Sequence, residues 1–332
     1  MSPPLEAVDR IEVQVLVDNV TDNLSTLPAG ADITHEWAYL LREGLVTEIS
    51  GDNTCCACHG LALVITVRTG DSDEHTVLFD GGPAGYAVRH NGERLATDFG
   101  RIDAIVLSHG HWDHAGGLLA ALELIRDAGD RGREIPFYVH PGMFRARASR
   151  RPDGQLVPYK EIPGPDTLAR SGASVVSSPE EQLIQGGRFY VSGEIPRVTS
   201  YETGFAGHMS LSDDGEWEPD PLIMDERFLA VNVRDKGLVV FSACSHAGVV
   251  NVLKNAARVF PGVPLHAVMG GFHLAGPGME QRIAETVRDM EDFGLDLIVP
   301  GHCTGFRAVH ALLNEFGDGI VVPSAVGRFH VF

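Results

Sequence analysis

The sequence has few positive charges and no long apolar run, and each shortage excludes a class of function. Lys and Arg total 26 against 45 Asp and Glu, which gives a formal net charge of −19. This charge repels phosphate backbones and anionic bilayers, so we expect binding neither to nucleic acid nor to membrane surfaces. The most apolar segments, such as Leu61–Val67, are far shorter than the roughly 20 residues that span a bilayer. The N-terminal stretch MSPPLEAVDR lacks the pattern of a secretion signal, so we predict a cytoplasmic protein.

Cysteine is also scarce, and its placement argues against disulfide bonds. Of the five cysteines, Cys55, Cys56 and Cys58 crowd into the stretch NTCCACHG. Neighbouring residues cannot all reach partners at disulfide geometry, so we predict reduced thiols. A soft metal or an iron–sulfur cluster is an alternative, but clusters use repeated C-x-x-C pairs that supply four thiolates, which this stretch lacks. The favoured interpretation is a loop of small, packed or disulfide-capable residues near an active-site mouth.

What the sequence does contain is an alternation of short apolar runs and helical patterns. With 332 residues, 44% of them hydrophobic, the chain has ordinary globular composition. Short runs rich in Val and Ile predict strands at Ile11–Val17, Leu61–Arg68, His75–Phe79, Ala104–Leu107, Leu229–Val233, Leu238–Ser242, Leu265–Met269 and Asp296–Val299. Helical spacing of apolar residues predicts helices after His114 and at Val249–Val259, Met279–Phe293 and Ala308–Phe316. The alternation indicates an α/β protein.

Between about residues 145 and 225 this pattern is lost. The strings RRPDG, IPGPD and DDGEWEPDP are rich in Pro and Gly and show little periodicity. Long loops in a compact domain are usually functional coverings, so we predict an irregular covering insertion here. The same region contains a cluster of four arginines: Arg145, Arg147, Arg150 and Arg151. Because guanidinium groups suit phosphate and carboxylate, the cluster could clamp either group. A solvated face is the favoured interpretation.

The richest chemistry lies in the segment IVLSHGHWDHAGG. Four potential metal ligands fall between a predicted strand and a predicted helix: His109, His111, Asp113 and His114. Alternate residues of such a turn project to one side, so two histidines can meet one cation while the Asp-His pair reaches a neighbouring one. A solvated turn is the alternative, but the following Gly-Gly pair also permits close packing of the helix.

Three further histidines follow predicted strands in the second half of the chain. His246 lies in FSACSHAGVVN, His273 in MGGFHL and His302 in VPGHCTG. A metal site assembled from successive loops requires this repeated placement. Any one of them alone would be an ordinary capping residue. Because they occur in the same chain as HGHWDH, we interpret His246 and His302 as metal ligands and His273 as a contact for substrate.

The H-x-H-x-D-H signature, matched by HGHWDH without a gap, resembles that of the metallo-β-lactamase superfamily. Asp80 in LFDGG stands where that superfamily carries a strand-end aspartate that organises the metal loop. The resemblance implies an αββα sandwich of two mixed β-sheets, with helices on the outer faces and the metal site at one sheet edge. Residues 1–332 would then form a single domain of this type, covered by the insertion at about 145–225.

Further strings resemble a narrower branch of that superfamily. They are LVDN at Leu16–Asn19, HGLAL at His59–Leu63 and the three downstream histidine segments. The branch includes dihydropterin ribofuranosylaminobenzene phosphate synthases and many members of unassigned activity. Because His59 belongs to the matching part, the resemblance implies that His59 faces substrate.

Two departures from the superfamily pattern stand out. The usual third-motif histidine has no clear counterpart, and His140 and His208 are the only candidates. The aspartate that usually bridges two metals is replaced by the string SACSH, with Cys244 and His246. Occupancy by one or by two ions therefore stays open.

We predict that His109, His111 and His246 hold one cation. Asp113, His114 and His302 would hold a second, if it binds. Imidazole and carboxylate suit zinc, manganese or iron, and zinc is our first choice. Cys244 is expected beside the site, as an added thiolate ligand or as a small buried neighbour, and Cys303 is expected in the packing.

The expected function is metal-dependent hydrolysis. A metal-bound hydroxide, available at neutral pH, would attack an ester, lactone, amide or phosphoester of a small molecule. A substrate that carries a phosphate or another anionic group would suit such a site. Asp113 would position the hydroxide and His273 would assist the leaving group. Condensation of the pterin-phosphate synthase kind, and a nonhydrolytic diiron redox or ligand-sensing role, stay open as alternatives. A homo-oligomer also stays open, because sheet edges permit self-association.

Overall fold

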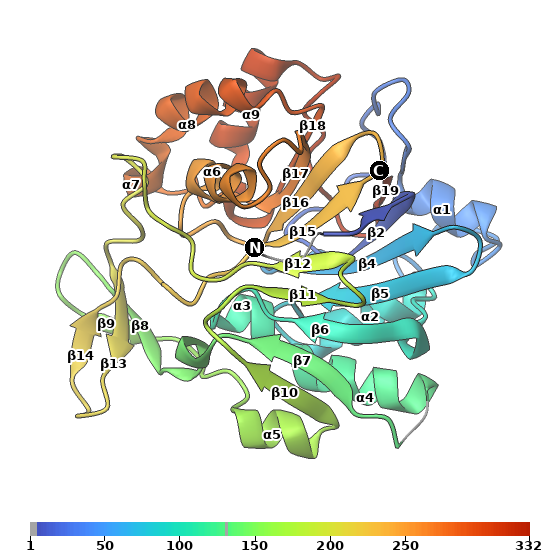
Figure 1. Cartoon of the computed structure of the whole chain (residues 1–332). Helices are drawn as coiled ribbons and strands as arrows, with labels where there is room; N and C mark the ends of the chain where they lie inside the picture. The colour runs from blue at the N-terminus through green and yellow to red at the C-terminus, as the bar shows by residue number, and fades with distance from the viewer. Residues whose placement is uncertain (1–4, 130–131) are drawn as a thin grey trace.

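Two β-sheets face each other at the centre of the molecule, and helices cover both outer sides (Figure 1). The computed structural model describes residues 5–129 and 132–332. The first four residues of MSPPLEAVDR, and Asp130 at the end of the helix expected after His114, therefore lie outside the described residues.

The first sheet has eight strands and mixes parallel with antiparallel pairs. In spatial order they are β10 (Ala173–Ser177), β7 (Ile135–Val139), β6 (Ile102–Val106), β5 (Asp73–Phe79), β4 (Ala62–Thr69), β2 (Arg10–Val17), β19 (Phe329–Val331) and β3 (Ile33–Thr34). β5 and β6 are parallel, whereas β4 is antiparallel to both β2 and β5. The carboxyl ends of β2, β5 and β6 therefore meet at one edge.

The second sheet has seven strands. They are β11 (Gln182–Ile184), β12 (Phe189–Val191), β15 (Leu229–Val233), β16 (Gly237–Ser242), β17 (Leu265–Gly271) and β18 (Leu297–Gly301), with β1 (Ala7–Val8) beside β15. β16, β17 and β18 run parallel, so their carboxyl ends also share an edge.

Side chains alternate between the two faces of each strand, and this alternation builds three apolar layers. In β16, Val239 and Phe241 join the layer between the sheets, whereas Leu238 and Val240 face the outer helices. The first sheet is covered by α2 (Gly85–Arg94) and α4 (Leu118–Ala128), and the second by α6 (Val249–Val259), α8 (Ile283–Met290) and α9 (Phe306–Phe316). The shorter helices are α1 (Glu36–Arg42), α3 (Trp112–Ala115), α5 (Pro165–Arg170) and α7 (Pro277–Glu280). The predicted αββα sandwich is confirmed.

Most expected elements lie within a few residues of the observed ones, and two predictions need correction. The helix expected over Met279–Phe293 is interrupted, because α7 ends at Glu280 and α8 begins at Ile283. Residues 145–225 are more regular than predicted, since β10, β11 and β12 extend the two large sheets. A separate four-stranded sheet consists of β14 (Trp217–Pro219), β13 (His208–Leu211), β8 (Arg147–Arg150) and β9 (Leu156–Pro158). These strands are too short to display a two-residue period between their Gly and Pro turns.

The described residues contain no helix long and apolar enough to cross a membrane.

A buried histidine in β19 predicts acid sensitivity of the fold. Neither ring nitrogen of His330 has a hydrogen-bond partner among the described residues, and burial, with Arg328 nearby, lowers its pKa to about 3. The unfolded imidazole has a pKa of about 6.5, so unfolding takes up a proton and stability falls as the pH drops from about 6.5 toward 3. We expect this residue to remove about 2 kcal/mol between pH 7 and pH 5.

Urea unfolding at both pH values tests this expectation, because the His330→Leu variant should lose about 2 kcal/mol less than the parent between pH 7 and pH 5. The comparison cancels the contribution of the other buried histidines. Equal losses in parent and variant would contradict the assignment.

Candidate metal centre

The HGHWDH segment follows β6 and continues into α3, and buried polar contacts fix its path. The Gly110 amide donates to Asp225 Oδ2 at 2.9 Å, and Arg147 pairs with Asp225 Oδ1 at 2.7 Å. A Cβ on Gly110 would lie 2.1 Å from the Met143 carbonyl oxygen, so only glycine fits at this position. The path of the loop is therefore fixed by the hydrogen bond of the Gly110 amide and by the buried Arg147–Asp225 ion pair.

Asp80, at the end of β5, orients two of the histidines. One oxygen accepts the Ser108 amide at 2.7 Å, and the other accepts the Ser108 hydroxyl at 2.8 Å and lies 2.7 Å from His114 Nδ1. Because the hydroxyl donates to Asp80, its oxygen accepts from His109 Nδ1, 2.9 Å away. Both Nδ1 atoms then carry the proton, which leaves Nε2 of His109 and of His114 with free lone pairs.

His208 orients His111 in the same way. Its Nδ1 lies 2.8 Å from the Asp220 carbonyl oxygen, which can only accept, so the Nδ1 atom carries the proton. The unprotonated Nε2 of His208 then accepts from His111 Nε2 at 3.0 Å. The lone pair of His111 is consequently on Nδ1, on the side of His109.

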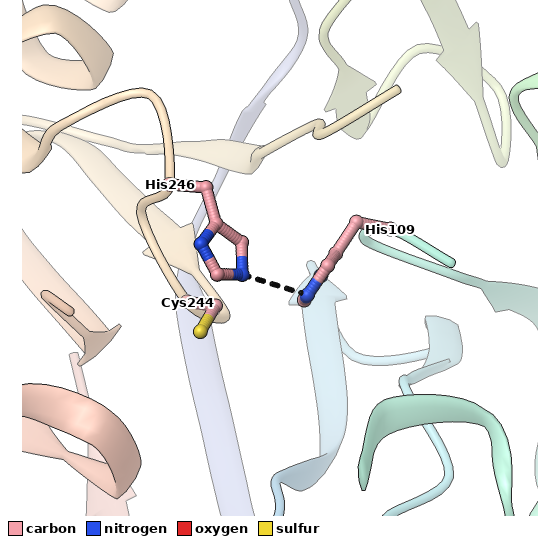
Figure 2. Close-up of side chains that lie close together, drawn as sticks. All are labelled: His109, Cys244 and His246. Carbon is pink, nitrogen blue, oxygen red and sulfur yellow. Dashed lines mark hydrogen bonds between the residues drawn. The ribbon is translucent and has the colours of Figure 1, made fainter. Parts of the chain in front are cut away.

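Three nitrogens converge where the two sheets meet. His111 Nδ1 lies 3.0 Å from His109 Nε2, and His246 Nε2 lies 3.2 Å from the same atom. Figure 2 shows His246 facing His109 across this gap. Burial is the largest cause that holds the pKa of all three imidazoles well below the usual value, so they are neutral at pH 7. We call His109, His111 and His246 the first triad.

The first triad fits a cation. The lone pairs of His109 Nε2 and His111 Nδ1 face each other with no proton to share, which is repulsive unless a positive charge lies between them. Ligand nitrogens at about 2.0–2.1 Å from a tetrahedral zinc ion stand roughly 3.4 Å apart, close to the observed separations. The donor set and its spacing therefore match a metal ion.

A second set of donors, Asp113, His114 and His302, surrounds a neighbouring point and is called the second triad. Asp113 Oδ2 lies 3.8 Å from His114 Nε2 and 3.4 Å from His302 Nε2, and both nitrogens are buried without a hydrogen-bond partner among the described residues. His302 Nδ1 lies 3.1 Å from Asn19 Oδ1, which already accepts the Gly60 amide, so the proton of His302 is on Nδ1. Nε2 of His302 thus faces the carboxylate and is the nitrogen that a metal ion would bind.

The charges around the second triad also favour a cation. Burial opposes ionisation of Asp113, but His114 and His302 hold the pKa of this carboxyl well below its usual value. Burial likewise disfavours a charged His302, yet Cys303 and Asp113 raise its pKa to about 9. A positive charge is therefore stabilised at this point, and a metal ion would displace the proton.

Cys244 lies beside both triads. Its sulfur forms one close group with donor atoms of His109 and His246 and another with those of His114 and His302, each within 4.8 Å. Figure 2 shows Cys244 and His246 emerging from one loop, which follows β16. Cys303, expected in the packing, has its sulfur 3.1 Å from that of Cys244. All five cysteines are free, as predicted.

A cavity of about 480 Å³ opens over the two triads. Trp112, Tyr159 and Phe205 supply aromatic walls, and both histidines expected to meet substrate, His59 and His273, are in the lining. His59 Nε2 lies 3.5 Å from Asp113 Oδ2, with 59% of its side chain exposed. Within the described part of the chain, the lining contains no Lys or Arg.

Several residues that the sequence offers as candidates do not reach this centre. His140 Nδ1 accepts a hydrogen bond from the Gly142 amide, and its Nε2 faces Glu194 at 3.4 Å. His140 therefore stabilises the turn in which it lies. Arg147 is buried against Asp225, and the three other arginines of the proposed clamp are exposed. The thiols of NTCCACHG belong to no group of three ligand atoms in the described ranges.

Most of the contacts that orient the ligands cannot be recognised in the sequence. Asn19 stands out there only within the LVDN string, and His208 only as a candidate ligand. Asp225 and Glu226 were missed, although Glu226 accepts the amides of His246 and Ala247 at 2.7 and 2.6 Å. The one available signal is a pair of adjacent acidic residues shortly before β15.

The sequence model of the Metallo-beta-lactamase superfamily matches residues 58–302, a range that includes both triads. The chain therefore belongs to the metallo-β-lactamase superfamily. This membership confirms the resemblance inferred from HGHWDH and Asp80.

Two proteins of Methanocaldococcus jannaschii are each 31% identical to the chain. One is named 7,8-dihydropterin-6-methyl-4-(beta-D-ribofuranosyl)-aminobenzene-5'-phosphate synthase, and the match covers 78% of this chain and 85% of that protein. The other is an uncharacterized protein, with 80% and 92% covered. Among solved structures, Tm1679, described as a metal-dependent hydrolase of the beta-lactamase superfamily, has a TM-score of 0.68 at 22% identity, covering 96% of this chain and 98% of that one. That likeness shows the shared fold.

The hydrogen bonds of Asp80 predict a loss of metal affinity when its charge is removed. In Asp80→Asn, an NH2 group replaces one carboxylate oxygen and cannot accept hydrogen bonds. The contacts to Ser108 and His114 can then not all be kept, so the imidazoles lose their orientation. We expect zinc affinity to fall about 10–100-fold, as measured by competition with a chromophoric chelator. Asp213→Asn, at an exposed turn, is the control and should bind zinc like the parent. Unchanged affinity in a folded Asp80→Asn protein would refute this role of Asp80.

Proposed function

We propose that the chain is a metal-dependent hydrolase whose two triads each hold one divalent cation. The observation that carries the proposal is the pair of unprotonated nitrogens, His109 Nε2 and His111 Nδ1, held 3.0 Å apart by contacts to Ser108 and His208. Cations bound there supply a Lewis acid and lower the pKa of a coordinated water from 15.7 toward about 7. Zinc is the first choice because imidazole dominates the donor set, and iron and manganese follow.

The chain's own residues would then handle protons and orientation. Asp113 would orient the attacking water, because its carboxylate is buried between His114 and His302. His59 would connect Asp113 with solvent, since its ring is largely exposed and contacts both Asp113 and Asn19. His273 would donate a proton to the leaving group, a role supported by its place in the cavity lining and by a ring distance of 4.3 Å to His246.

The cavity lining favours a small substrate with a planar ring. Trp112, Tyr159 and Phe205 offer apolar faces, on which an aromatic or heteroaromatic ring packs well. An anionic group on the substrate would be neutralised by the cations, because the described lining has no Lys or Arg. We therefore propose hydrolysis of an ester, lactone or phosphoester that carries such a ring. The free thiols suit the cytoplasmic location predicted from the sequence.

Condensation is the second candidate, and a specific observation favours it. The relative that is 31% identical over 78% of this chain carries the name of a pterin-phosphate synthase. In such a reaction the cations would activate a leaving group, and the aromatic walls would hold the ring of the incoming partner. Both candidates use the same triads.

Removal of a ligand in the first triad should abolish metal binding and activity together. In His111→Ala the facing lone pair is lost while β6 and α3 keep their packing, so we expect at least about a tenfold loss of zinc affinity with a native circular dichroism spectrum. Elemental analysis after dialysis measures the zinc content. His310→Ala, at an exposed position of α9, should retain the metal. Full metal content in His111→Ala would remove the site assignment.

An aromatic preference distinguishes this cavity from a general hydrolytic site. We expect the zinc-loaded protein to hydrolyse aryl phosphodiesters or lactones with higher kcat/KM than aliphatic analogues. Phe205→Ala should reduce the ratio of kcat/KM for aryl over aliphatic substrates about 2–10-fold. Tyr86→Ala, at an exposed position, should not change this ratio. Bond formation that requires two pterin precursors, without hydrolysis of any ester, would favour condensation. Tight binding of a precursor without turnover would favour ligand sensing.

A further inference from the structure

Cys244 occupies a position that no other described residue shares. Its sulfur belongs to one group with His109 and His246 of the first triad and to another with His114 and His302 of the second triad. In each group the three donor atoms lie within 4.8 Å of one another. Within the residues that the structure describes, Cys244 is the one side chain grouped with histidines of both triads.

We propose that the Cys244 thiolate is a seventh ligand, which bridges the two cations of the proposed metal centre. This inference rests on the proposed function and adds to its ligand set. Each triad supplies three donors, and a tetrahedral ion accepts four. A single sulfur near both triads can be the fourth ligand of both ions, and because catalytic zinc can expand to five ligands, a position remains for the coordinated water. Coordination replaces the S–H bond with bonds from sulfur to metal, and the thiol proton leaves to solvent.

Two potential hydrogen-bond donors lie beside the Cys244 sulfur. His273 Nδ1 lies 3.4 Å from Cys244 Sγ, and the Cys303 sulfur lies 3.1 Å away. An N–H and an S–H at these distances can donate to an anionic sulfur, as hydrogen bonds around metal-bound thiolates commonly do. The Cys303 sulfur also lies 3.4 Å from the Cys244 carbonyl oxygen, so its single S–H can point either to that oxygen or to the Cys244 sulfur.

Cys303 is the competing sulfur ligand, and its contacts distinguish it from Cys244. The close group that contains Cys303 consists of Cys244 and His273, and includes no residue of either triad. Cys303 therefore supports the bridging sulfur without binding the ions. The bridge would favour zinc, cobalt or iron over manganese and magnesium, because thiolates are soft ligands.

Two measurements on the full chain test the bridge. X-ray absorption of the two-zinc protein should show a sulfur neighbour at about 2.3 Å beside nitrogen and oxygen at about 2.0–2.1 Å. With cobalt in place of zinc, thiolate coordination should produce a sulfur-to-cobalt charge-transfer band in the near ultraviolet. Cys244→Ser should lose that band and bind the second ion at least about tenfold more weakly. The matched control, Cys303→Ser, should keep the band.

The outcomes separate this inference from the proposed function. Two bound zinc ions with no sulfur neighbour, or a charge-transfer band that survives in Cys244→Ser but disappears in Cys303→Ser, would overturn the bridge and leave the hydrolase proposal intact. Failure of the parent protein to bind zinc or cobalt would overturn the proposed function itself. If Cys244→Ser does not fold, the absorption spectrum of the parent still decides whether sulfur binds the ions.

Discussion

The direction of a few imidazole lone pairs is the constraint on which the rest of the site depends. Each ring that faces the centre has two nitrogens. For every ring of the two triads except His246, a hydrogen-bond partner on the side away from the centre places a proton on that outer nitrogen. Asp80, Asn19 and His208 supply those partners through contacts of 2.7–3.1 Å. Nitrogens that would otherwise share protons are thereby left as neutral electron-pair donors, which metal binding requires.

The sandwich supplies the rigidity that this arrangement requires. β5 and β6 of the first sheet, and β16 and β18 of the second, deliver ligands or their supports from carboxyl ends that meet at one edge (Figure 1). Because each ligand follows its strand by only a few residues, packing between the sheets determines the separation of donors from different loops. Buried imidazole nitrogens that lack a hydrogen-bond partner cost free energy, and Nε2 of His114 and of His302 are such atoms. A purely structural role therefore explains this cluster poorly.

Much of this could be predicted from the sequence, for identifiable reasons. HGHWDH places four donors within one short turn, so no long-range contact is needed to recognise it. Strands such as β4 carry a continuous run of apolar and β-branched residues. The three-residue strands β9, β11, β12 and β14 were missed because a two-residue period cannot show over that length. The roles of Asn19, His208 and Glu226 depend on contacts between distant segments, which a single sequence does not encode locally. The cysteine in SACSH stands out in the sequence, but its relation to both triads emerges only when two sheets are brought together.

The central claim is that two cations bind where these lone pairs converge. An anomalous difference map from crystals of the zinc-loaded protein, recorded on both sides of the zinc absorption edge, tests it most directly. The account predicts two peaks, one bounded by His109, His111 and His246 and the other by Asp113, His114 and His302. Zinc peaks elsewhere, with those six side chains hydrogen-bonded only to one another, would contradict it.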